Sequence, residues 1–241
     1  FSCDAAGASL DVGSAVYAAL DTIAPLMTGG LLAFPKLGRA YFALLGHTLE
    51  TYPHLLPSAP PALATALLAA LEHGCTVTGD EDLAKPSLEG LAALARWAAP
   101  DAAGGGAGGA TMGPHLGARL VRPLLASLLV GGDGSSLAVP RSRVDAAADA
   151  LLPLAMGAPS AWGEARTALL GSVADPTARA RLEACLASFE AALGEAAAAL
   201  EGGGGRQGRS GGAVVERAAR RKFRGAANAF VEAARGIVRS R

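Results

Sequence analysis

The stretch LLAFPKLGRAYFALLGHTLETYPHLL, residues 31–56, contains one clear helical pattern. Pro35 stands just before the pattern and Pro53 just after it, and proline suits the first turn of a helix but cannot continue one. Charged side chains such as Lys36, Arg39 and Glu50 fall between the positions of the apolar face. Those positions recur every three or four residues, as one buried helix face requires: Leu37, Tyr41, Leu44, Leu45, Thr48, Leu49 and Tyr52. The stretch therefore predicts a single amphipathic helix.

The composition extends this interpretation to the whole chain of 241 residues. Half of the residues are apolar, at 51 %, but only 5 % are aromatic, and much of the apolar content is alanine. Such a composition favours closely packed helices over a sheet rich in β-branched and aromatic residues. Each leucine-rich run is broken by proline, glycine or a charge before it reaches the length of a membrane span. We therefore expect an all-α protein without membrane insertion.

The same 3.6-residue period predicts nine helices, from Val12 to about Val238. They form short-looped pairs, and the second members begin near Lys36, Asp80, Arg141 and Pro176. Once a glycine-rich insertion is removed, the spacing approaches the period of about 40–47 residues that is typical of HEAT and armadillo repeats. The predicted fold is a HEAT/armadillo-type α-solenoid of stacked antiparallel helix pairs. A globular all-α domain with antiparallel helix pairs is the alternative.

Two glycine-rich tracts divide the predicted helices into blocks. We expect helix pairs over 1–100, a glycine-rich insertion over 101–114, further pairs over 115–200, a glycine-rich linker over 201–213 and a basic capping helix over 214–241. Charge follows this division, because residues 206–241 carry ten Lys or Arg and two Glu, while the remainder carries eleven basic and nineteen acidic residues. The body is acidic and the end of the chain is basic.

Several motifs resemble the exportin-4 type of nuclear export receptor, in the importin-β superfamily. These are the F-P-x-L-x-x-x-Y-F-x-L core over 34–44, ETYP at 50–53, LEHG at 71–74 and SLEGLAALA at 87–95. ADPTARARLEACLASFEAAL at 174–193 is similar to a further segment, and ERAARRKFRGAANAFVEAARGIV at 216–238 to the terminal helix. The exportin-7 type shares the architecture and stays as an alternative.

The resemblance implies a non-catalytic transport receptor that shuttles between nucleus and cytoplasm. Its partners would be Ran-GTP, nucleoporins and protein cargo, which for this family includes the hypusine-bearing translation initiation factor. Three widely spaced cysteines fit a reducing compartment. Because the second helix of each pair usually lines the concave side, five acidic residues are the candidates for contact with basic cargo or Ran: Glu50, Asp80, Glu81, Asp82 and Glu89.

No residue pattern points to catalysis or to a cofactor. The chain has no G-x-S-x-G nucleophile motif, its glycine-rich tract lacks the G-K-[ST] of a phosphate loop, and its four histidines lack the spacing of metal ligands. Two other classes of function remain open. One is a HEAT-repeat scaffold unrelated to transport, and the other is a nucleic-acid-binding module that uses the basic C-terminus. We expect nucleic acid not to be the partner, because a solvated helix face also explains the basic run.

Overall fold

The computed structural model describes residues 11–77, 80–99, 106–130, 139–203 and 209–238, and over these residues the chain is helices joined by short turns and connections. The prediction of an all-α protein is confirmed over these residues, which contain no strand. None of the described helices combines the length and the apolar character needed to cross a bilayer. The α-helices are α1 (Val12–Ile23), α2 (Gly29–Leu32), α3 (Pro35–Thr51), α4 (Pro61–Thr76), α5 (Glu81–Trp97), α6 (Gly106–Val130), α7 (Arg141–Gly157), α8 (Pro159–Gly171), α9 (Pro176–Gly203) and α10 (Arg209–Val238), and η1 (Ala24–Leu26) and η2 (Pro53–Ser58) are 3-10 helices.

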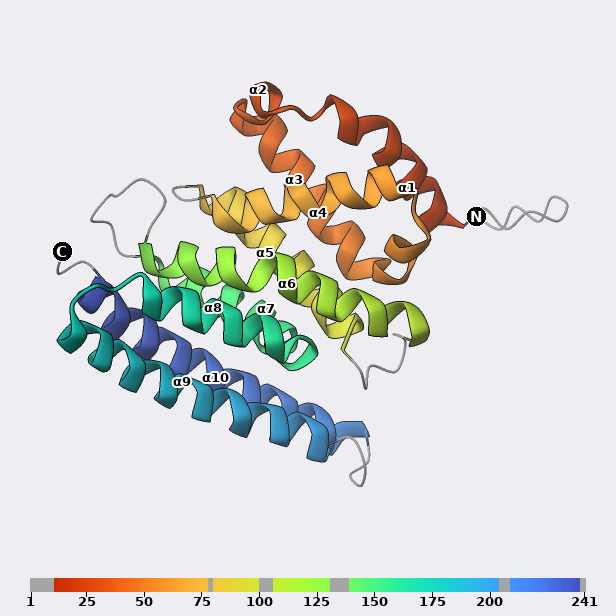
Figure 1. The fold of residues 1–241 in the computed structure, drawn as a ribbon. Helices are drawn as coiled ribbons and strands as arrows, with labels where there is room; N and C mark the ends of the chain where they lie inside the picture. The colour runs from red at the N-terminus through yellow and green to blue at the C-terminus, as the bar shows by residue number, and fades with distance from the viewer. Residues whose placement is uncertain (1–10, 78–79, 100–105, 131–138, 204–208, 239–241) are drawn as a thin grey trace, which may run out of the picture.

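The helices follow one another through the molecule, from α1 at one end to α9 and α10 at the other (Figure 1). Helix α3 packs on α5, α5 on α7, and α7 on α10, and we call these four helices row A. Helix α4 packs on α6, α6 on α8, and α8 on α9, and these form row B. The two rows pack on each other, and together they bury one hydrophobic core. The spacing argument expected the helix at Pro176 to follow α7 in its row, but α10 occupies that place.

The helix predicted from the opening stretch is α3, with Pro35 at its first position. Its buried side differs in part from the prediction. Tyr41, Leu45 and Leu49 are buried as expected, whereas Leu37 and Leu44 are 40 % and 39 % exposed. Phe42, Gly38 and Gly46 face the interior in their place: Phe42 is fully buried and both glycines are buried.

Glycines bring the backbones of α3 and α5 unusually close together. A Cβ atom on Gly46 would lie 2.5 Å from the carbonyl oxygen of Pro86, and one on Gly90 would lie 2.8 Å from the Cα of Gly46. Real Cβ atoms essentially never make such approaches. The close crossing therefore depends on glycine at positions 46 and 90, because glycine has no side chain. Pro86 does not delay the start of α5, which begins at Glu81 after Asp80 caps it.

Parts of both glycine-rich tracts are helical. Residues 101–105 and 204–208 lie outside the described residues, but α6 already begins at Gly106, and α10 at Arg209. On α6, Gly113 would place a Cβ 3.0 Å from the carbonyl oxygen of Ala98, at the end of α5. Tertiary packing therefore overrides the low helix propensity of this glycine.

An aromatic cluster joins the last two helices. Phe189 of α9 stacks on Phe223 and Phe230 of α10, with ring centroids 5.1 and 4.9 Å apart. Trp162 of α8 approaches the same ring at 5.8 Å. Phe223, Phe230 and Ile237 recur every seven residues in the sequence, and all three are buried on one stripe of α10.

Burial should make Cys75 unreactive in the folded protein. Its side chain is 1 % exposed, and burial raises the pKa of the thiol from 9.0 to about 12. In a Cys3→Ser, Cys185→Ser background, we expect a thiol reagent at mildly alkaline pH to label folded Cys75 more than about a hundredfold more slowly than the urea-denatured chain. Because only the unfolded chain loses this proton near 9.0, the thiol's contribution to stability should also decline as the pH rises above that value. Rapid labelling without denaturant would contradict this packing.

Candidate functional site

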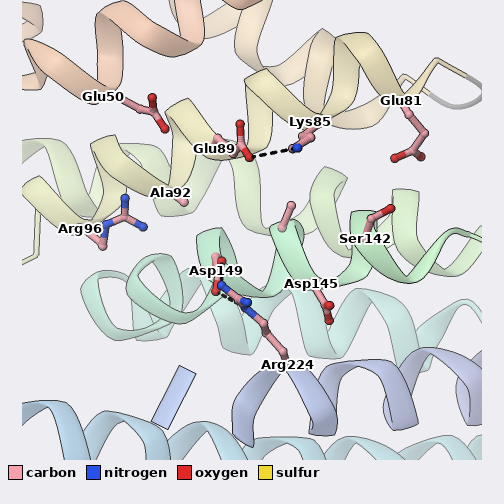
Figure 2. A pocket seen from close by; sticks show the side chains of 11 residues that line it. Glu50, Glu81, Lys85, Glu89, Ala92, Arg96, Ser142, Asp145, Asp149 and Arg224 are labelled. Carbon is pink, nitrogen blue, oxygen red and sulfur yellow. Dashed lines mark hydrogen bonds and ion pairs between the residues drawn. The ribbon is translucent and has the colours of Figure 1, made fainter. Parts of the chain in front are cut away.

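A pocket of about 230 Å³ opens across row A. All four helices of the row contribute side chains to it, as Figure 2 shows for Glu50 of α3, Glu89 and Arg96 of α5, Asp149 of α7, and Arg224 of α10. These residues are far apart in the sequence. The packing of successive row A helices is therefore what brings them together.

Acidic side chains outnumber basic ones around this pocket. Its five carboxylates belong to α3 (Glu50), α5 (Glu81, Glu89) and α7 (Asp145, Asp149), and its three cations are Lys85, Arg96 and Arg224. We call the five carboxylates the acidic rim. Glu50, Glu81 and Glu89 are among the predicted site residues, and the structure gathers them in one pocket.

Two polar contacts fix α10 beside the acidic rim. The Arg224 guanidinium donates two hydrogen bonds to the Asp149 carboxylate, at 2.8 and 2.5 Å, and this interaction raises the pKa of Arg224. One turn further along, Asn228 donates to Asp145 at 2.7 Å. A bidentate arginine–carboxylate pair of this kind fixes orientation as well as distance. These contacts hold the α7 carboxylates in place from the α10 side.

Arg96 lies half-buried within the pocket, near the end of α5. Burial is the main cause that lowers its pKa, and the positive charge of Arg220 adds to that effect. The carboxylates of Asp149, Glu216 and Glu50 act in the opposite direction. The Arg96 guanidinium thus lies near both acidic and basic side chains, where the carboxylates of α3 and α7 come close to the arginines of α10.

The other two predicted site residues do not line this pocket. Asp80 accepts hydrogen bonds from the backbone N–H groups of Asp82 and Leu83, at 3.0 and 3.3 Å, and so caps α5. Asp82 lies 3.1 Å from a guanidinium nitrogen of Arg39, and Asp80 lies 3.6 Å from the same group. Both carboxylates thus take part in local contacts at the start of α5.

Sequence reasoning missed Asp145, Asp149, Arg96 and Arg224. Asp145 and Asp149 are four residues apart on a predicted helix, so they share a face, and this spacing was a usable signal. Nothing in the sequence pairs either of them with α10, which begins about sixty residues later along the chain. Their role in the pocket depends on the three-dimensional packing.

The site is built from charged side chains without a metal-ligand cluster. Within the described parts of the chain, no three His, Cys, Asp or Glu side chains are grouped as a metal site would require. No protein-family model matches the chain. No solved structure matches it either.

Proposed function

We propose that this chain is a protein-binding helical-repeat segment of a nuclear export receptor, and that row A is its binding face. The observation that carries the proposal is the pocket built jointly by α3, α5, α7 and α10, in which five carboxylates face three cations. In a stacked α-solenoid, successive helices of one row form an extended surface for partner proteins. The alternating packing of rows A and B supports that architecture for this chain.

The acidic rim suits basic side chains of a partner. Lysine and arginine side chains gain charge-assisted hydrogen bonds from carboxylates, and neighbouring carboxylates offer several acceptors to one ammonium group. Resemblance to exportins supplies the identity of the proposed partners, which are protein cargo such as the hypusine-bearing initiation factor, Ran-GTP and nucleoporins. Binding across many repeats agrees with a pocket whose residues come from four helices.

Neutralising three glutamates of the rim tests the proposal. We expect Glu50→Gln, Glu81→Gln and Glu89→Gln together to weaken binding of a fluorescent oligolysine peptide, because each exposed charge contact contributes about 0.2–1 kcal/mol. The loss should be several-fold at low ionic strength and smaller at physiological salt, where the Debye length is about 8 Å. Fluorescence anisotropy titrations on the 241-residue chain measure both affinities.

A matched control separates this site from general charge effects. Glu164→Gln on α8 and Glu201→Gln on α9 change exposed acids outside the pocket and should leave the affinity unchanged. Helical content and melting temperature should be the same in both variants. Equal affinity of wild-type chain and triple variant at low salt would remove the acidic rim from the binding face.

The export role needs its own measurement. Cargo should bind the receptor that contains this segment in the presence of Ran loaded with a non-hydrolysable GTP analogue, and not with Ran-GDP. The triple variant should weaken that complex, while the Glu164 and Glu201 control should not. Cargo binding that is independent of Ran would instead indicate a scaffold unrelated to transport.

A further inference from the structure

Four arginines lie beside the buried stripe of α10. That stripe includes Phe223 and Phe230. Arg217 and Arg221 are exposed, whereas Arg220 and Arg224 are half-buried and form ion pairs with Glu216 and Asp149. The four arginines line a pocket of about 480 Å³ together with Val214 and Ala218: Arg217, Arg220, Arg221 and Arg224. We call these four residues the arginine stripe.

The arginine stripe and the acidic rim are continuous. Arg224 lines both pockets and forms the bidentate pair with Asp149 of the rim. Arg96 of the acidic pocket is close enough to Arg220 for the two charges to influence each other. The two pockets therefore adjoin at Arg224, and we call them together the groove: its charged lining is mostly acidic over α3, α5 and α7 and basic over α10.

The mixed charges of this groove favour a protein chain over a nucleic acid. A nucleic-acid strand carries a phosphate about every 3.4 Å, so its backbone would also have to cross the acidic rim. Carboxylates also stand within the basic part, since Glu216 lies 2.8 Å from a guanidinium nitrogen of Arg220. A polypeptide can change the sign of its charge from one residue to the next, and thus can match both halves.

We infer that the groove binds an extended partner segment in which a basic stretch adjoins an acidic stretch. The acidic rim takes the lysines or arginines of that segment. The arginine stripe takes its carboxylates, chiefly through the exposed Arg221, because Arg220 and Arg224 already pair with Glu216 and Asp149. Planar guanidinium groups suit this second task, because each can donate two parallel hydrogen bonds to one carboxylate. Binding of the basic stretch to the acidic rim rests on the proposed function. Binding of the acidic stretch to the arginine stripe goes beyond it.

Three labelled peptides test the inference on the full chain at low salt. One carries a lysine block joined to a glutamate block, and the other two carry a single block each. The two-block peptide should bind several-fold more tightly than either single-block peptide. Arg221→Glu should weaken the two-block and glutamate peptides about two- to five-fold, and should leave the lysine peptide bound at least as tightly. Arg181→Glu, an exposed arginine of α9 outside both pockets, is the matched control and should change none of the three affinities.

The outcomes separate the inference from the proposed function. A two-block peptide that binds no better than the lysine peptide would show that the arginine stripe does not bind an acidic stretch. That result would leave the proposed function intact. A lysine peptide that does not bind would overturn the proposed function, and the inference with it. A single-stranded RNA that binds more tightly than the two-block peptide, and loses affinity in Arg221→Glu, would replace the peptide with nucleic acid as the occupant.

Discussion

Replacing Phe189 with alanine is expected to lower the free energy of unfolding by about 3–5 kcal/mol, the usual cost of deleting a buried phenylalanine ring. Phe189 is 2 % exposed, and its ring meets Phe223, Phe230 and Trp162. Alanine leaves a cavity that the remaining rings, which are anchored on α8 and α10, cannot fill. For a chain of this size, the melting temperature should fall by about 10 °C. Urea denaturation followed by far-UV circular dichroism measures the change.

Phe34 provides the matched control. It stands just before α3 and is 65 % exposed. Phe34→Ala removes the same ring from a solvated position, so the free energy of unfolding should change by no more than about 0.5 kcal/mol. Comparable losses in the two variants would mean that the aromatic cluster does not hold α8, α9 and α10 together.

Alanine at Gly46 is expected to destabilise the protein by about 1–3 kcal/mol, although alanine is the better helix former by about 1 kcal/mol. The new Cβ would meet the backbone carbonyl of Pro86 at 2.5 Å, and a backbone atom inside a packed helix cannot move aside cheaply. Steric overlap therefore outweighs the gain in helix propensity. Thermal and urea unfolding of the variant should both show the loss.

Alanine at Gly163 should instead stabilise the protein. Gly163 lies inside α8, and a Cβ there would meet nothing within 4 Å. Gly163→Ala should therefore raise the free energy of unfolding by up to about 1 kcal/mol through helix propensity and a less flexible unfolded chain. If Gly46→Ala also proved stabilising, the close crossing of α3 and α5 would be wrong.

Local signals in the sequence predicted most of the helices. Proline at the start of α3 and Asp80 before α5 act within a few residues of the chain, and the structure confirms both of them. Such signals operate through capping and through one buried face, so they can be read without knowing the neighbouring helices.

Packing between distant helices could not be predicted in the same way. The repeat spacing did not reveal that α10 follows α7 in row A, because a regular spacing does not specify the row that each helix enters. Leu37 and Leu44 fit the apolar period but remain exposed, whereas Gly38 and Gly46 are buried. For the candidate site, the glutamates of α3 and α5 could be proposed from their helix positions, but the pairing of Asp149 with Arg224 joins residues 75 positions apart.

The crossing of α3 and α5 also constrains how this sequence can diverge. Every substitution at Gly46 or Gly90 places at least a Cβ against backbone atoms. Neither glycine can therefore be replaced while α3 and α5 keep this close crossing. At Gly163 and Gly194 the surrounding space is open, and alanine or a polar residue can replace glycine freely. Among descendants of a common ancestor, glycine should therefore be retained at 46 and 90 and exchanged at 163 and 194. The positions at which glycine is retained would then mark where the helix backbones approach each other closely.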